Sequence, residues 1–242
     1  FAGVPAFGGA VECRRDRTQP TVGCLLQTEV SNEGDALALT VDRVGRFYER
    51  VLARKADLQN QDRTPGGLFD ELIGGIYPEK AKLLGQRTGE MHRALASAAN
   101  EPAFAPAPFN AMAQRSVYPT LRASLRRAFA LLKKRLPQLP AEFREEAKEV
   151  LAAEQQILAQ EQRLLENPFG VHKIRIHGDY HLGQALYTGK DFVILDFEGE
   201  PARALSERKL KRSALRDVAG MMRSFQYAAY SALWQPAMRS ED

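Results

Sequence analysis

The spacing of hydrophobic and polar positions divides the chain into strand-like and helix-like stretches. Apolar and β-branched runs at residues 8–15 and 21–30 flank a turn-forming stretch, and this pattern predicts a β-hairpin. From Asp35, a residue type that caps helices, apolar residues recur three or four positions apart, and this helical period continues to about residue 166. We therefore expect a hairpin followed by a block of helices.

Prolines divide this helical block. Pro78 suits the first turn of a helix, and the proline-rich stretch 101–109 predicts a loop. Pro137 and Pro140 separate an apolar helix from a long charged helix that ends near residue 167.

The period changes again at His172. Three short β runs follow, at 175–177, 184–188 and 192–197, and the last two are joined by a turn at Gly189. After them the chain returns to helix, with one predicted inward face made of Leu215, Val218, Met222, Gln226, Ala229 and Leu233. A hairpin, helices, a small β patch and more helix make an α+β organisation.

Composition and charge narrow the classes of protein. The 242 residues are 44% hydrophobic and 26% charged, as in globular proteins, and the net charge is +4. Basic stretches lie beside acidic ones, which favours solvated helix faces over a nucleic-acid partner. No apolar run approaches the length of about 18 residues that spans a membrane. Cys13 and Cys24 fit neither a metal site nor a disulfide framework, so we expect a cytoplasmic protein.

Two segments concentrate polar residues that packing does not explain, HGDYHLGQ (177–184) and DFEGEP (196–201). Asp179 follows a β run, Asp196 ends the most apolar run in the chain, and Gln184 offers a neutral oxygen. Oxygen ligands of this kind bind Mg²⁺ together with phosphates, and a free carboxylate can orient a hydroxyl nucleophile. The alternative is that both carboxylates merely cap turns.

These segments resemble known kinases. HGDYHLGQ is similar to the catalytic loop of the aminoglycoside-phosphotransferase-like kinases, and DFEGEP is similar to their counterpart of the protein-kinase Asp-Phe-Gly metal loop. Together with RDVAGMMRSFQYAA and the hinge-like LLQTEVSNEGDAL, they resemble the maltokinases. These enzymes make maltose 1-phosphate from maltose and ATP, act in trehalose and glycogen metabolism, and often follow a trehalose synthase domain in the same polypeptide.

The resemblance runs through nearly the whole chain and implies a protein-kinase-like fold. Residues 1–34 would be the end of the small lobe and the hinge, and 35–242 would be the helical large lobe. Asp179 would be the catalytic residue, and Gln184 and Asp196 would bind Mg²⁺.

Further roles follow from the same resemblance. His177 would order the catalytic loop, and Glu29 and Val30 would present main-chain groups to the adenine of ATP. The substrate-binding candidates are Glu198, Arg223, Tyr227 and Tyr230. For Tyr227 and Tyr230, with Trp234, a packing role in the core is the alternative; Glu198 would otherwise only pair with a nearby arginine.

The sequence departs from the family pattern at two points. Position 184 is Gln where most relatives have Asn, and the chain shows neither the glycine-rich turn nor the strand lysine that cover the phosphates in such kinases. We therefore expect a piece of a longer kinase that is inactive alone. The alternatives are a kinase for another small molecule, such as an aminoglycoside or choline, and a non-catalytic scaffold.

Overall fold

The computed structural model describes residues 1–14, 20–54, 71–166 and 170–239. The chain forms two compact units, one made of residues 1–105 and 174–242 and the other of 106–173. Each unit is described by itself. The lobe boundary at residue 34 stays a prediction.

The first unit begins with the predicted hairpin. Strands β1 (Phe7–Cys13) and β2 (Thr21–Gln27) pair antiparallel, with Val11 opposite Cys24. Both cysteines are free and exposed.

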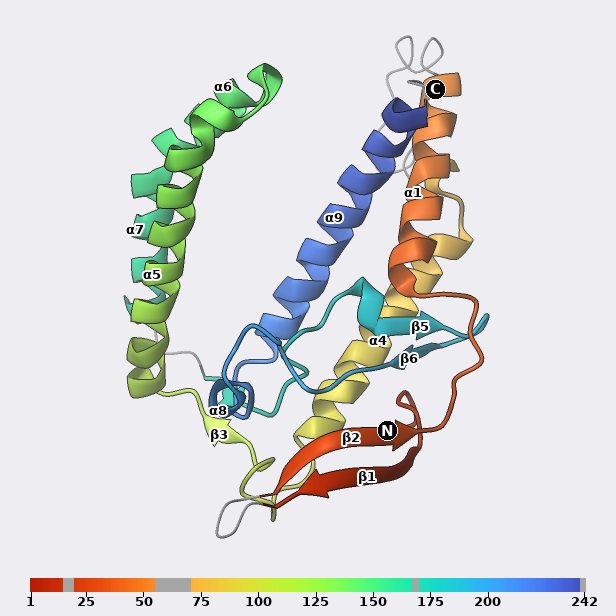
Figure 1. Ribbon diagram of the computed structural model, residues 1–242, viewed down its shortest axis with the longest axis vertical. Coiled ribbons are helices and arrows are strands. Elements are labelled where there is room, and N and C mark those ends of the chain that lie inside the picture. Colours follow the sequence, from red (N-terminus) through yellow and green to blue (C-terminus); the bar gives the residue numbers. More distant parts are fainter. Residues whose placement is uncertain (15–19, 55–70, 167–169, 240–242) are drawn as a thin grey trace. The chain divides into compact units, whose positions relative to one another are not determined.

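Two predicted helices also form in the first unit. Helix α1 (Ala36–Ala53) is capped by Asp35, whose carboxylate accepts a hydrogen bond from the Ala38 N–H at 2.7 Å. Helix α4 (Ile76–Leu95) carries Pro78 in its first turn, as predicted. Helix α1 lies against α9 (Leu215–Arg239), and their pairing is visible in Figure 1.

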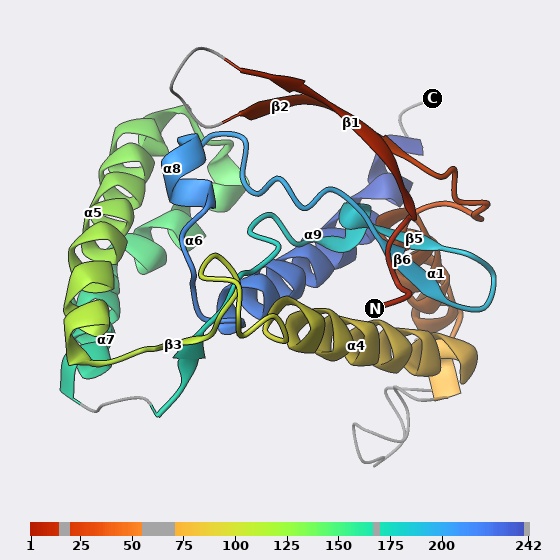
Figure 2. The same ribbon diagram turned by 90° about the horizontal axis from the view of Figure 1, so that it is seen from below.

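The second unit contains helices α5 (Ala111–Arg135), α6 (Ala141–Ala152) and α7 (Glu154–Glu166), with a 3₁₀ turn at Leu136–Gln138. Two-residue strands β3 (Ala107–Pro108) and β4 (His172–Lys173) pair at its base. The prediction of one long charged helix is wrong, because the helix is interrupted at Ala153. Helix α7 packs along α5 (Figures 1 and 2).

The predicted β patch is only partly present. Strands β5 (Ala185–Tyr187) and β6 (Phe192–Ile194) form a hairpin, and Gly189 in its turn has a φ of 86°, which glycine adopts readily. The run 175–177 is not a strand, which corrects the prediction. Its neighbour Ile174 makes an isolated bridge to Arg212. The backbone N–H groups of His177 and Gly178 donate to a side chain of α9, as described below.

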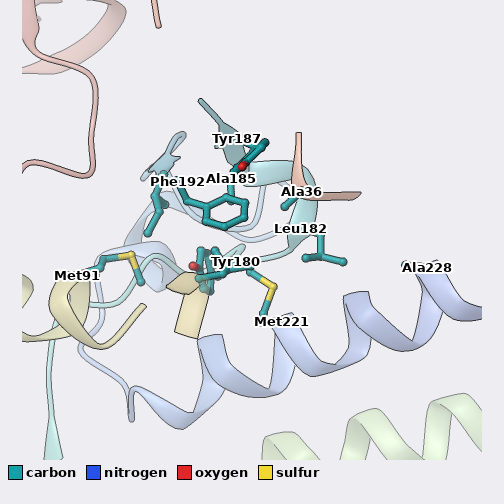
Figure 3. Close-up of a cluster of buried hydrophobic side chains, with 11 residues drawn as sticks. Ala36, Met91, Tyr180, Leu182, Ala185, Tyr187, Phe192, Met221 and Ala228 are labelled. Carbon is teal, nitrogen blue, oxygen red and sulfur yellow. The ribbon is translucent and has the colours of Figure 1, made fainter. Parts of the chain in front are cut away.

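The core of the first unit lies directly beneath the HGDYHLGQ loop. In Figure 3, Tyr180 of this loop lies between Met91 of α4 and Met221 of α9. The other buried members come from α1, α4, β5, β6, α9 and the 3₁₀ turn Leu182–Gln184: Ala36, Leu84, Leu182, Ala185, Tyr187, Phe192, Ile194 and Ala228. The loop is therefore built on a packed layer and does not project freely into solvent.

The inward face of α9 differs from the predicted one. Leu215 and Met222, which were expected inside, are 67% and 68% exposed. The buried face instead carries Asp217, Met221, Ser224, Ala228 and Ala232. Small and hydrogen-bonding side chains lie inward because this helix approaches the backbone of the HGDYHLGQ loop and α1 closely. Hydrophobic periodicity alone selects the largest apolar residues and so picks the wrong face.

Candidate active site

A buried carboxylate on α9 holds the HGDYHLGQ loop. The Asp217 side chain is fully buried, and its two oxygens accept hydrogen bonds from the backbone N–H groups of His177 and Gly178, each at 2.9 Å. The His92 ring nitrogen Nε2 lies 2.9 Å from the same carboxylate. Hydrogen bonds to a buried carboxylate are strong. The backbone at His177 and Gly178, the first two residues of the loop, is therefore fixed before any ligand binds.

Sequence reasoning missed Asp217 as a functional residue. The available signal was its position, since it shares a helix face with Met221 and Ser224 at a spacing of four and seven residues. A carboxylate on a buried helix face needs donors nearby. Ser224 supplies a second anchor, because its hydroxyl accepts a hydrogen bond from the Leu182 N–H at 3.0 Å.

His177 is buried and neutral. Its Nε2 lies 2.7 Å from the Leu195 carbonyl oxygen, so Nε2 carries the proton, and the Asp179 N–H points to its Nδ1 at 3.4 Å. Burial lowers the pKa of His177, although the hydrogen bond to Leu195 and the nearby carboxylates of Asp217, Asp196 and Asp179 oppose this. His177 thus joins the HGDYHLGQ loop to the strand that leads to Asp196. A loop-ordering role for it remains a proposal.

A hydrogen bond from Tyr180 to α4 further fixes the loop. The Tyr180 hydroxyl lies 2.8 Å from the Thr88 hydroxyl, which itself donates to the Leu84 carbonyl at 2.8 Å. The Tyr180 hydroxyl is therefore the donor of the first bond. Burial raises the pKa of Tyr180 to about 12, so the phenol stays protonated and keeps this bond.

Close backbone approaches require glycine at two positions. Gly178 has a φ of 89°, and a Cβ there would lie 3.3 Å from the Gly199 Cα, so the HGD and DFEGEP loops meet at these two residues. On α9, a Cβ at Gly220 would lie 2.7 Å from the Tyr180 carbonyl oxygen. The helix can therefore reach the loop only because position 220 lacks a side chain.

The Asp179 carboxylate is half-buried and unengaged. Within the described ranges, no side chain or backbone group donates a hydrogen bond to it, in contrast to Asp217. A carboxylate on a fixed backbone with free lone pairs can accept a proton from a bound hydroxyl. This is the chemistry that the sequence predicts for Asp179, and the catalytic assignment stays a prediction.

Gln184 and Asp196 lie side by side, as the predicted metal ligands should. The Gln184 Nε2 donates to the Asp196 Oδ2 at 3.1 Å, and rotation of the amide would offer its oxygen to a cation. Asp196 has a φ of 60°, an uncommon backbone conformation, and it is exposed. In the described part of the chain, no cluster of three or more His, Cys, Asp or Glu residues is placed to hold a metal ion. Mg²⁺ commonly takes only one or two protein ligands and completes its shell with phosphates and water, so this pair fits it.

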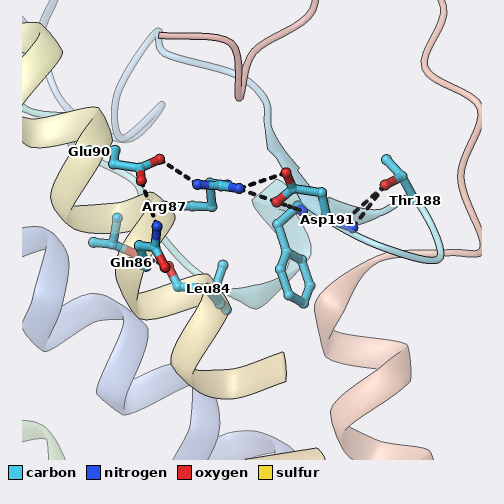
Figure 4. Close-up of polar contacts among 8 residues, drawn as sticks. Leu84, Gln86, Arg87, Glu90, Thr188 and Asp191 are labelled. Carbon is cyan, nitrogen blue, oxygen red and sulfur yellow. Dashed lines mark hydrogen bonds and ion pairs between the residues drawn. The ribbon is translucent and has the colours of Figure 1, made fainter. Parts of the chain in front are cut away.

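A second network fixes the hairpin that leads into Asp196. Figure 4 shows Arg87 of α4 between Glu90 and Asp191, the residue before β6. Its guanidinium binds both Asp191 oxygens, at 2.7 and 2.8 Å, and Glu90 at 2.6 Å. The hydrogen bond from Arg87 lowers the pKa of Asp191. The bidentate pair orients the β5–β6 turn on α4.

The remaining predicted site residues are surface residues of the first unit. Glu29 is exposed, and the Val30 carbonyl accepts a hydrogen bond from the Asn32 amide at 2.8 Å. The Glu198 carboxylate is 64% exposed and lies 4.0 Å from the Arg208 guanidinium. Their predicted contacts with ATP and substrate stay predictions.

The outer face of α9 presents an aromatic and basic stripe. Tyr227 and Tyr230 are 58% and 55% exposed, and Trp234 is 51% exposed, so a core role for these three residues is wrong. The Arg223 guanidinium stacks on the Tyr227 ring at 4.4 Å and contacts the Tyr227 hydroxyl. The stripe is ordered by its own contacts, and its binding of a sugar stays a prediction.

Two loops that each carry carboxylates, fixed on a packed core, form a site typical of phosphoryl transfer. The model described as "Phosphotransferase enzyme family" matches residues 33–199, and the chain belongs to this family. The predicted membership of the aminoglycoside-phosphotransferase-like enzymes and the α+β kinase-like fold are therefore confirmed, whereas the maltokinase assignment stays a prediction.

The most informative individual relatives are glucosamine kinases. One from Streptacidiphilus jiangxiensis is 34% identical over 58 residues, which cover 24% of this chain and 13% of that protein. One from Mycolicibacterium smegmatis is 38% identical over 63 residues, which cover 26% and 16%.

Solved glucosamine kinase structures share the fold. One, in crystal form A, has a TM-score of 0.66 at 23% identity and covers 97% of this chain and 46% of that one. Another, in complex with glucosamine, ADP and inorganic phosphate, has a TM-score of 0.68 at 24% identity, with 97% and 50% covered. The chain thus spans about half the length of these kinases. Among the described helices, none has the length and apolar character needed to cross a membrane.

Proposed function

We propose that the complete protein transfers the γ-phosphoryl group of ATP to a sugar hydroxyl, with the anomeric hydroxyl of maltose as acceptor. The observation that carries this proposal is the contrast between two carboxylates of one site. Asp217 is saturated with donors and holds the loop, whereas Asp179 is presented by that loop with its lone pairs free. A carboxylate without structural hydrogen bonds can accept the proton of a bound hydroxyl, which would be the role of Asp179.

In the proposed reaction, the acceptor oxygen attacks the γ-phosphorus in line with the leaving oxygen of ADP. As the new P–O bond forms and the bond to ADP breaks, the hydroxyl proton passes to a carboxylate oxygen of Asp179. The bonds from Asp217 to the loop backbone keep this carboxylate in place, and positioning of this kind supplies much of the acceleration in phosphoryl transfer.

Asp196 and Gln184 would hold Mg²⁺. The ion would neutralise charge on the phosphates. Asp196 is exposed, and its contact with Gln184 keeps the two side chains together. The adenine would bind the main chain at Glu29 and Val30.

The sugar would bind near Glu198 and the outer stripe of α9, where Arg223 can bridge hydroxyl groups and the rings of Tyr227 and Tyr230 can pack on a sugar face. These side chains are exposed and therefore accessible to a ligand. A trehalose synthase domain in the same polypeptide and a cytoplasmic location accompany this proposal.

Maltose is supported by the resemblance of HGDYHLGQ, DFEGEP and RDVAGMMRSFQYAA to maltokinases. The second candidate is glucosamine, which the similar kinases carry in their names. Arg223 favours the neutral sugar, because its guanidinium lies on the outer stripe of α9, where the sugar would bind, and would repel a protonated amino sugar there.

The test is an acceptor panel with the complete protein, Mg²⁺ and ATP, in which phosphorus NMR identifies each product. We expect maltose to be phosphorylated at its reducing-end C1, glucose much more slowly, and kanamycin and choline not at all. Faster turnover of glucosamine would replace the maltose assignment and leave the sugar-kinase proposal intact. A lack of turnover with every sugar would contradict both.

A further inference from the structure

A pocket beside the catalytic loop is crowded with arginines. It is open to solvent at its mouth, has a cavity volume of about 20 Å³, and is bordered by Gly178 and Gly199, the point at which the HGDYHLGQ and DFEGEP loops meet. Its charged lining residues are Glu200, Arg203, Glu207, Arg208, Arg212 and Arg216. Four cations thus face two carboxylates.

The two carboxylates compensate little of this charge. Glu207 lies 3.8 Å from the Arg203 guanidinium, beyond hydrogen-bond distance, and the two side chains are 47% and 37% exposed. Glu200 accepts a bond from the Ala202 N–H at 3.3 Å. Among the described residues, Arg208 is the one arginine of the four with two hydrogen-bond acceptors, because it donates to the Arg203 and Pro201 carbonyls at 2.9 and 2.8 Å.

The other three arginines have donors to spare. The Nε groups of Arg203 and Arg212 are buried and have no hydrogen-bond partner within the described part of the chain. Burial and the nearby charges of Arg203 and Arg212 lower the pKa of Arg216. Buried donors without acceptors and like charges side by side both cost free energy, and a bound anion would relieve both costs.

We propose that Arg203, Arg212 and Arg216 form a binding site for a small tetrahedral oxyanion, represented by inorganic phosphate. Guanidinium groups bind phosphate oxygens in paired hydrogen bonds, which suits three forks around one ion. The cavity volume of about 20 Å³ is far below the range of about 300 to 1,000 Å³ typical of drug-sized ligands, so a small ion held at the open mouth of the pocket suits it better than a nucleotide.

The backbone around the site is already fixed. Arg212 exchanges two backbone hydrogen bonds with Ile174, at 2.9 Å each, and Arg216 directly precedes the loop anchor Asp217. An ion held by these arginines would therefore stabilise the segment that carries Asp217, and so the start of the catalytic loop.

The test is thermal unfolding of the complete protein without ATP or sugar, at constant ionic strength. Phosphate and sulfate at about five times their Kd should raise the melting temperature by about 2 to 4 °C. Acetate should have no such effect. This readout does not depend on turnover, so it can fail or succeed independently of the proposed function.

Arg212→Met and Arg203→Met remove a guanidinium and keep an apolar stem, so each should weaken the phosphate effect at least tenfold in concentration. The matched control is Arg126→Met, an exposed arginine of α5 that should respond to phosphate like the wild type. The proposal is overturned if phosphate does not stabilise the wild type, if acetate acts as strongly as phosphate, or if both pocket variants keep the full response.

Discussion

Arg216 and Asp217 are neighbouring residues of α9 beside the HGDYHLGQ loop, and they differ in how far other groups of the chain compensate their charges. Asp217 is fully buried and accepts bonds from two backbone N–H groups, so its charge is compensated within the chain. Arg216 lies near Arg203 and Arg212, whose Nε groups have no acceptor within the described ranges. The comparison indicates that groups of the chain itself satisfy the carboxylate that holds the loop, whereas the proposed partner of the adjoining arginines is an external anion.

The largest effect on stability is expected at Asp217, whose charge is compensated by loop donors. Asp217→Asn keeps the shape of the side chain but replaces one acceptor oxygen with a donor, so a backbone N–H of the loop loses its partner. We expect a loss of about 3 to 5 kcal/mol in the free energy of unfolding, measured by denaturant titration, and a loss of phosphoryl transfer.

The matched control for that variant is Asp42→Asn on α1, where the carboxylate is 47% exposed and pairs with Arg46. Its effect should stay below about 1 kcal/mol. Equal effects of the two substitutions would show that Asp217 does not anchor the loop.

A smaller effect is expected where α9 touches the loop backbone. Gly220→Ala places a Cβ 2.7 Å from the Tyr180 carbonyl oxygen and should cost about 1 to 3 kcal/mol of stability. Gly89→Ala on α4 has open space around the new methyl group and should stabilise by up to about 1 kcal/mol through helix propensity. Differential scanning calorimetry of both variants is the measurement, and a stabilising Gly220→Ala would contradict the close approach.

The neutral His177 makes stability depend on pH. Its pKa in the folded protein is lowered by burial from an ordinary value of 6.5, so the unfolded chain binds a proton more readily. Stability is therefore full above about pH 6.5 and falls as the pH drops from there towards the folded-state pKa. His177→Asn should flatten this part of the curve, whereas His172→Asn, at an exposed position, should not.

The smallest effect on stability is expected at Arg212, in the arginine pocket. Without an anion, Arg212→Met removes a buried unpartnered donor and a like charge near Arg216, so stability should change by less than about 1 kcal/mol or rise slightly. A loss as large as that of Asp217→Asn would mean that Arg212 is compensated within the protein, which would remove the contrast.

The sequence predicted those elements that local chemistry decides. The cap at Asp35, the turn at Gly189 and the hairpin β1–β2 follow from residue types within a few positions of one another. The proximity of Gln184 and Asp196 was expected from the resemblance of HGDYHLGQ and DFEGEP to kinase metal loops, and the β5–β6 hairpin lies between the two residues.

Contacts between distant segments were harder to foresee. Asp217 lies 40 residues from His177, and no local pattern indicates that its carboxylate binds the backbone N–H groups of His177 and Gly178. The buried face of α9 was missed for the same reason, because Gly220 and Ser224 are inside owing to their contacts with the loop and not to their hydrophobicity.

The most direct test of the proposed function is the rate of a single phosphoryl transfer in the complete protein with Asp179→Asn. Because Asp179 makes no side-chain hydrogen bond within the described ranges, the variant should keep the melting temperature and the ATP affinity of the wild type. Its transfer rate to maltose should fall by about 10² to 10⁴. A rate within a few-fold of the wild type would contradict the assignment of Asp179 as the group that receives the acceptor proton.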